Sequence, residues 1–169
     1  MIVKKNLFIP SKIRYVKGDK PRVDCILCAI IAKNPKVENL EVFRSPHFCI
    51  CANLYPYSPG HLMVFPLRHI EDVRALTQKE ALEMFKLEKA TLEILDRVYT
   101  PHGYNIGYNI GEGSGNSIRH LHLHIVPRYK NELGFVDIIS GSRIIVDDPR
   151  KRLPKVRELF RTRKGTFKI

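Results

Sequence analysis

Residues 120–126 constrain the fold more than any other stretch, because histidine and aliphatic residues alternate strictly within them. Successive side chains of a β-strand point to opposite faces, so the pattern predicts a strand with His120, His122 and His124 on one face. The aliphatic residues between them would anchor the other face in a core. Neighbouring histidines on such a strand are about 7 Å apart and the outer two about 13 Å apart. A straight strand therefore cannot bring all three imidazoles to one metal ion.

Three roles remain open for histidines placed in this way. They can be purely structural, His120 and His122 alone can chelate a metal ion, or at least one of the three can act as a nucleophile or acid–base group. The glycine- and serine-rich loop at 109–118 favours the last role, because glycines let main-chain N–H groups approach phosphate oxygens closely. The candidate phosphate-binding residues of this loop are Asn109, Ser114, Gly115, Asn116 and Ser117.

Hydrophobic patterning predicts the other elements of the chain. A short helical turn is expected at 25–33, and strands are expected at 39–44, 47–54, 60–66, 104–110 and 119–126, the last two as a hairpin around the loop. Thr77 and Glu80 form a capping box that opens one long helix to about residue 99. The apolar residues that recur along it at helical spacing are Leu82, Phe85, Leu92, Leu95 and Tyr99. A strand at 142–147 and a helix after Pro149 complete an α+β fold, an antiparallel sheet of about five strands with one long helix.

Charge and length bound the possible partners. The 169 residues suffice for one domain, and 29 Lys and Arg against 17 Asp and Glu give a formal charge of +12. Such a field attracts polyphosphates, and nucleic acid only non-specifically, since no nucleic-acid motif accompanies it. The basic residues are concentrated in an N-terminal arm at 1–24 and near the C-terminus. No apolar run approaches the ~18–20 residues that span a bilayer, so no membrane partner is expected. Four cysteines without a signal peptide indicate a cytoplasmic protein.

A second pattern concerns the cysteines. Cys25 and Cys28 have the spacing of one corner of a tetrahedral zinc site, which needs two further ligands. A redox pair and two buried free thiols are the alternatives. Cys49 and Cys51 alternate within an apolar strand and are expected to be packing residues rather than a disulfide.

The same residues resemble the histidine triad (HIT) family, whose motif His-φ-His-φ-His-φ-φ matches 120–126 without a gap. Residues 59–69 resemble the family's upstream strand, and 115–118 resemble its phosphate loop, with Asn116 where glutamine is more usual. The similarity runs from about 25 to 128, which defines an expected HIT domain at 25–130. Segments 7–10, 14–16, 55–61 and 138–142 look like the bacterial and archaeal diadenosine tetraphosphate phosphorylases and hydrolases.

The resemblance implies nucleotidyl transfer through a covalent histidine. His122 would attack the α-phosphorus, His124 would contact the phosphate or protonate the leaving group, and His61 would lie near the same phosphates. Asn53 is a candidate for the ribose hydroxyls, although it and Asn109 can also be ordinary turn residues. Structural zinc would be held by Cys25, Cys28, His69 and His120, with His47 as an alternative ligand and no organic cofactor.

Family members pair their sheets across a homodimer, so the extension at 131–169 is expected to pack on the same domain or on the partner. The expected substrates are adenine nucleotides or dinucleoside polyphosphates, above all diadenosine tetraphosphate. Either water or orthophosphate can be the acceptor, and the branch-like segments favour orthophosphate. A nucleoside phosphoramidase, an aminoacyl-adenylate hydrolase and a non-catalytic nucleotide-binding module remain alternatives.

Overall fold

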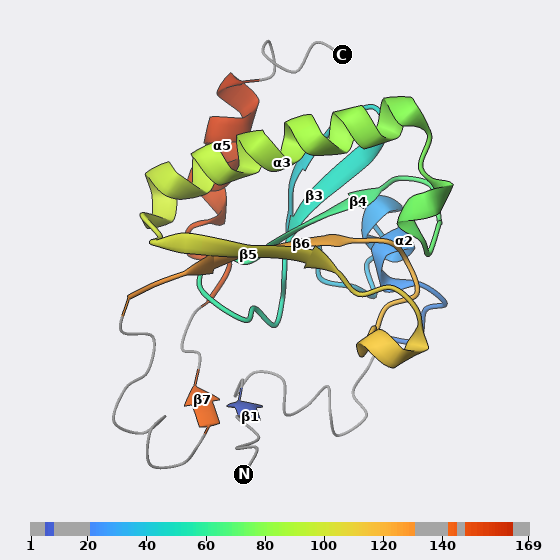
Figure 1. The fold of residues 1–169 in the computed structure, drawn as a ribbon, viewed down its shortest axis with the longest axis horizontal. Coiled ribbons are helices and arrows are strands. Elements are labelled where there is room, and N and C mark those ends of the chain that lie inside the picture. Colours follow the sequence, from blue (N-terminus) through green and yellow to red (C-terminus); the bar gives the residue numbers. More distant parts are fainter. Residues whose placement is uncertain (1–5, 9–20, 131–141, 145–147, 164–169) are drawn as a thin grey trace.

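A five-stranded antiparallel sheet forms the centre of the computed structural model, which describes residues 6–8, 21–130, 142–144 and 148–163 (Figure 1). The strand order is β2-β3-β4-β6-β5. Their bounds are β2 Glu41–Arg44, β3 Phe48–Ala52, β4 Leu62–Pro66, β5 Gly103–Tyr108 and β6 Leu123–Arg128. The predicted α+β class and five-stranded sheet are therefore confirmed.

Within the described residues, three α-helices accompany the sheet: α2 Ile26–Ile31, α3 Gln78–Tyr99 and α5 Leu153–Thr162. Short 3-10 turns lie at η2 Val73–Ala75 and η3 Glu112–Ser114. A separate parallel pair joins β1 Asn6–Phe8 to β7 Ser142–Ile144, a pairing that the sequence did not indicate. Most of the predicted basic arm at 1–24, and positions 145–147 of the predicted strand, lie outside the described residues.

The central strands β3 and β4 are buried at every position, which explains why they read as continuous apolar runs in the sequence. Cys49 and Cys51 are buried free thiols within β3, so the prediction that they are packing residues is confirmed. Figure 1 shows α3 running across one face of the sheet with α5 beside it. A strand buried on both faces holds its neighbours in register, and β4 is the neighbour of the histidine strand β6.

The long helix α3 begins where the capping box predicted. The Thr77 hydroxyl accepts from the Glu80 N–H, and the Glu80 carboxylate accepts from the Thr77 N–H at 2.8 Å. Two of the apolar residues that suggested the helix, Leu82 and Phe85, are 52% and 57% exposed. The sheet instead buries a different row of apolar side chains along the helix, the first of which is Met84. This row lies on the side of the helix that faces β4 and β6.

The predicted strand at 119–126 was wrong at its start, because β6 begins only at Leu123. The Leu121 N–H donates to the Ile70 carbonyl at 2.6 Å, away from the sheet. If β6 continued to pair with β4 toward its start, the strand would use the Pro66 carbonyl. That carbonyl instead accepts from the His120 side chain at 2.9 Å. His120 and His122 therefore lie on irregular backbone before the strand, and only His124 is within it.

The helix α5 covers the sheet edge formed by β2. The Phe160 ring stacks on Phe43 with centroids 5.2 Å apart, and Arg157 Nε donates to the Glu41 carbonyl at 2.8 Å. Such a cover protects edge strand groups from pairing with other chains. At the opposite edge, Ile106 of β5 is 40% exposed. Among the described helices, none has the length and apolar character needed to cross a bilayer.

Candidate active site and metal centre

His122 is a buried imidazole held in one tautomer. Its Nδ1 lies 2.7 Å from the main-chain carbonyl of His120. A carbonyl can only accept, so Nδ1 carries the proton and Nε2 carries the lone pair. Burial lowers the pKa of His122, which keeps the ring neutral near pH 7. His122 therefore presents an unprotonated nitrogen, the form that a nucleophile requires.

A chain of hydrogen bonds fixes the tautomers of His61 and His124. His61 Nδ1 accepts from the Tyr57 N–H at 3.1 Å and from Asn53 Nδ2 at 3.3 Å. Its Nε2 must then be the protonated nitrogen, and it donates to His124 Nδ1 at 2.9 Å. The remaining proton of a neutral His124 consequently lies on Nε2. Burial lowers the pKa of His61 well below its usual value and that of His124 to about 4, so both rings are neutral at pH 7.

His122 and His124 thus present opposite hydrogen-bonding groups at Nε2, a lone pair on His122 and an N–H donor on His124. The ring centroids of His122 and His124 are 4.6 Å apart, with an interplanar angle of 78°. The rings are closer than the ~7 Å that separates alternate residues of a regular strand, and His122 lies before the start of β6. An Nε2 lone pair on His122 and an Nε2–H donor on His124 are the pair that attack on phosphorus needs.

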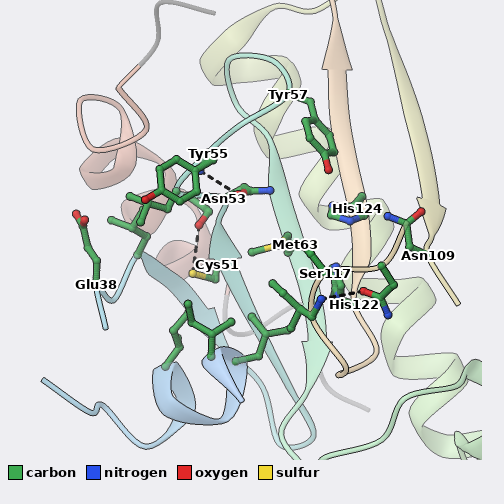
Figure 2. A pocket seen from close by; sticks show the side chains of 18 of the residues that line it. Glu38, Cys51, Asn53, Tyr55, Tyr57, Met63, Asn109, Ser117, His122 and His124 are labelled. Carbon is green, nitrogen blue, oxygen red and sulfur yellow. Dashed lines mark hydrogen bonds between the residues drawn. The ribbon is translucent and has the colours of Figure 1, made fainter. Parts of the chain in front are cut away.

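A cavity of about 270 Å³ opens over these two histidines (Figure 2). His122 and His124 line it together with most of the other predicted nucleotide-binding residues: Asn53, Asn109, Gly115, Asn116 and Ser117. Its apolar lining comes largely from helix α2 and the early strands, namely Ile26, Leu27, Ile30, Leu40, Leu54 and Met63. One apolar side and one side rich in amides and imidazoles match the two halves of a nucleotide.

Two predicted histidines lie elsewhere. His61 is 1% exposed and is absent from the cavity lining, so it acts behind His124 rather than on a ligand. His120 also leaves the cavity and turns its ring toward the cysteines. The three histidines of the motif are therefore divided between the cavity and the cysteine cluster.

The glycine- and serine-rich loop owes its shape to glycine. Gly111 and Gly115 have φ values of 79° and 75°, which side-chain-bearing residues rarely adopt. The Asn116 side chain accepts from the Ile118 N–H at 3.1 Å and stabilises the turn into the histidine segment. Ser114 turns away and donates to the Gly111 carbonyl at 2.7 Å, so Ser117 is the serine that remains at the cavity.

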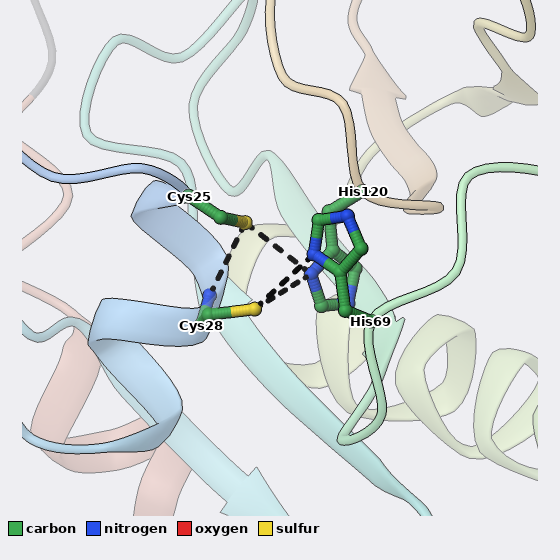
Figure 3. Close-up of side chains that lie close together, drawn as sticks. All are labelled: Cys25, Cys28, His69 and His120. Atoms are coloured by element: carbon green, nitrogen blue, oxygen red, sulfur yellow. Dashed lines mark hydrogen bonds between the residues drawn. The ribbon is translucent and has the colours of Figure 1, made fainter.

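Cys25, Cys28, His69 and His120 form a possible metal site (Figure 3). Their ligand atoms all lie within 4.8 Å of one another. His120 Nδ1 is 3.4 Å from each sulfur, and His69 Nδ1 is 3.3 Å from Cys28 Sγ. A tetrahedral zinc ion with ordinary bond lengths separates sulfur and nitrogen ligands by about 3.6 Å. The three sulfur–nitrogen distances are near that value, so the chemistry and the spacing of the four side chains suit such an ion.

The surroundings of the cluster suit metal ligands. His120 Nε2 donates to the Pro66 carbonyl, which leaves the Nδ1 lone pair for a metal, and burial lowers the pKa of His120 to about 4. Burial and the neighbouring Cys25 raise the pKa of Cys28 to about 11, so a thiolate there needs a nearby cation. His47, the alternative ligand, is instead bound to Glu83, with Nδ1 2.5 Å from the carboxylate.

The cluster and the cavity share two structural elements. Helix α2 carries Cys28 and also lines the cavity with Ile26, Leu27 and Ile30. His120 offers its ring to the cluster and its carbonyl to His122. The position of the His122 imidazole consequently depends on the segment that the cluster fixes.

Tyr57 is a residue that the sequence did not indicate. Its ring stacks on His61 with centroids 5.0 Å apart and lies 5.8 Å from the ring of His124. It also lines the cavity. Its place between Pro56 and Pro59, just before Gly60, was the available signal, because two prolines stiffen the loop that carries it.

Comparison with known proteins gives a family and a fold. The model of the HIT domain matches residues 34–131. A protein of Mycobacterium tuberculosis named AP-4-A phosphorylase is 40% identical over 109 residues, which are 64% of this chain and 56% of that protein. The asymmetrical bis(5'-nucleosyl)-tetraphosphatase of Schizosaccharomyces pombe is 31% identical over 97 residues, 57% of this chain and 53% of that enzyme.

The match therefore spans little more than half the length of these relatives. Among solved structures, a zinc-bound histidine triad family protein of Mycobacterium smegmatis superposes with a TM-score of 0.66 at 21% identity. The superposition covers 85% of this chain and 97% of that one, and it shows that the two share a fold.

Proposed function

The chain belongs to the HIT domain family, and we propose that it cleaves dinucleoside polyphosphates, diadenosine tetraphosphate in particular, through a nucleotidyl-His122 intermediate. The observation that carries this proposal is the fixed tautomer of His122, whose Nδ1–H donates to the His120 carbonyl and leaves Nε2 free in the cavity. A protein that only binds nucleotides has no need of a buried, neutral and oriented imidazole.

In the first step, the Nε2 lone pair of His122 attacks the α-phosphorus, and the bond from phosphorus to the bridging oxygen breaks. The leaving nucleotide accepts a hydrogen bond from His124 Nε2–H, whose tautomer the Tyr57–His61–His124 chain of hydrogen bonds fixes. His61 is a positioning residue in this scheme, because it touches His124 and not the ligand.

In the second step, an acceptor attacks the same phosphorus, and the electron pair of the P–N bond returns to His122. Orthophosphate would give a nucleoside diphosphate, and water would give a monophosphate. The greater similarity to the tuberculosis protein named a phosphorylase supports orthophosphate over water.

The cavity lining suggests how the nucleotide is held. The apolar side formed by α2 suits the base, and Asn53 suits the ribose hydroxyls although its Oδ1 already accepts from the Tyr55 N–H. Asn109, Gly115, Asn116 and Ser117 suit the phosphates, because they line the same cavity as His122 and His124 and carry N–H and hydroxyl donors, and Figure 2 shows Asn109 and Ser117 near the two histidines.

The metal that suits the four-ligand cluster is structural zinc, bound by Cys25, Cys28, His69 and His120. When bound, zinc ties helix α2 to the segment before β6 and supplies no Lewis acid to the reaction, because the cavity lining includes neither histidine ligand. The neutral Nδ1 of His120 and the sulfur pair are the groups that hold it.

The quaternary state and domain limits are part of the proposal. We place the catalytic domain at 25–130, with flanking segments at 1–24 and 131–169, in a homodimer that joins the β5 edges of two sheets. The partly exposed Ile106 on that edge supports this arrangement. A reducing cytoplasm suits four cysteines that are all free.

Product analysis tests the proposal. The purified protein is incubated with diadenosine tetraphosphate, with and without orthophosphate, beside the His122→Ala variant. We expect ATP and ADP with orthophosphate present, and no turnover with unchanged nucleotide binding in the variant. Turnover close to wild type in His122→Ala would refute the covalent mechanism. Cleavage of phosphoramidates or aminoacyl-adenylates alone would reassign the substrate.

A further inference from the structure

Three polar side chains gather at the histidine end of the cavity. Figure 2 shows Tyr57 and Asn109 on either side of His124, with the Tyr57 hydroxyl at the end of the ring nearer to His124. Within the described part of the chain, no hydrogen bond occupies the Tyr57 hydroxyl or the Asn109 side-chain amide. The tautomer chain adds His124 Nε2–H. Three unused donors thus lie together around His124 at the histidine end of the cavity.

The main chain and the ring of Tyr57 both contact His61, and these contacts fix the position of its hydroxyl. Its main-chain N–H is bonded to His61 Nδ1, and its ring stacks on the His61 ring at an interplanar angle of 27°. The side chain is 40% exposed, so its outer surface meets solvent while the hydroxyl faces the cavity. A fixed donor in contact with solvent is suited to a group that enters after the first product has left.

The chemistry of the second step defines what enters that space. The acceptor attacks opposite the P–N bond of nucleotidyl-His122, and therefore occupies the position that the leaving phosphate vacated, beside His124. Glu38 is the one carboxylate among the described residues of the lining, and Figure 2 shows it at the far end. Arg150 also neutralises it, with contacts of 2.6 and 2.8 Å. The acceptor position thus offers donors without a nearby uncompensated negative charge.

We propose that Tyr57 binds the orthophosphate acceptor through its hydroxyl and thereby directs the intermediate to phosphorolysis instead of hydrolysis. This inference rests on the proposed nucleotidyl-His122 function. An oxygen of monohydrogen phosphate forms the new bond to the α-phosphorus as the bond to His122 Nε2 breaks. The nitrogen recovers its lone pair, and the phosphate proton stays on the new terminal phosphate and equilibrates with solvent. The product is a nucleoside diphosphate.

The Tyr57→Phe variant tests the hydroxyl alone, because phenylalanine keeps the ring stacked on His61. Wild type and variant receive diadenosine tetraphosphate over a range of orthophosphate concentrations. The ATP released in the first turnover reports the first step, and the ADP to AMP ratio reports the partition of the intermediate. Tyr104→Phe is the matched control, since it removes a hydroxyl that bonds Asp96 at 2.7 Å, outside the cavity.

First-turnover release of ATP should also slow in Tyr57→Phe, because the leaving phosphate occupies the same position before it departs, but the ADP to AMP ratio reports only the partition of the intermediate. The ADP to AMP ratio should fall by about tenfold or more, as loss of a hydrogen bond to a charged group predicts. The KM for orthophosphate should rise, and Tyr104→Phe should leave the ratio unchanged.

An unchanged ratio in Tyr57→Phe would overturn the inference and leave the covalent mechanism intact. So would a wild-type protein that releases only AMP at every orthophosphate concentration. If the wild type neither cleaves diadenosine tetraphosphate nor forms a nucleotidyl group on His122 when the substrate is radiolabelled, both the inference and the proposed function would be overturned.

Discussion

Replacing Cys28 with serine should release the metal and weaken the fold. Its sulfur lies 3.4 Å from His120 Nδ1 and 3.3 Å from His69 Nδ1, and these partners lie 92 and 41 residues further along the chain. Losing this ligand removes the link between helix α2 and the segment before β6. Because the cluster exists only in the folded chain, the binding free energy of the metal is folding free energy.

The size of the effect follows from linkage. A metal present at 100 to 1,000 times its Kd stabilises the folded state by about 2.7 to 4.1 kcal/mol. In a domain of this size each kcal/mol shifts Tm by about 2–4 °C, so Cys28→Ser should lower Tm by about 5–15 °C. The single-turnover rate of substrate cleavage should also fall about 10- to 100-fold, because the His120 carbonyl orients His122 through a contact of 2.7 Å.

Metal analysis, thermal unfolding and single-turnover rates are measured on protein purified without chelator. Cys49→Ala is the matched control, because Cys49 is a buried cysteine of β3 outside the cluster and should keep its full complement of zinc. Wild-type protein without zinc would refute the site. So would a Cys28→Ser variant that keeps both its zinc and its Tm.

Two predictions concern the residues that hold helix α3. The Glu83 carboxylate is fully buried and accepts from Ser45 Oγ and His47 Nδ1, each at 2.5 Å, so Glu83→Ala should lower the free energy of unfolding by about 3–5 kcal/mol in urea titrations; a loss below about 1 kcal/mol would contradict this. Arg68 beside Glu80 lowers the pKa of that carboxyl from 4.5 to about 2, so its contribution is complete above pH 4.5 and is lost as the pH falls toward 2. Since Arg68 is half-exposed, Glu80→Ala should lower the free energy of unfolding by only about 1–2 kcal/mol at pH 7, including the loss of the helix cap, and by less at pH 2. A loss of stability that does not depend on pH would refute the contribution of the ion pair.

Local sequence patterns predicted the elements well, because each depends on residues that are near neighbours in the chain. The capping box of Thr77 and Glu80 placed the start of α3 correctly. The alternation around His122 indicated a strand, yet β6 begins only at Leu123. Its start depends on bonds to Ile70 and Pro66, which lie more than 50 residues earlier and which no local pattern reports.

The sequence by itself determined which chemical groups this protein has: alternating imidazoles, a cysteine pair and a glycine-rich loop, since residue type and short-range spacing are written in the chain. Tertiary structure alone decided how those groups are used. The direction of the hydrogen bonds from Tyr57 through His61 to His124 makes one imidazole a donor. The His120 carbonyl leaves the other with a free lone pair. Proton positions depend on partners brought together by folding, so the sequence named His122 and His124 as candidates, and only the folded chain shows which nitrogen of each ring carries the proton.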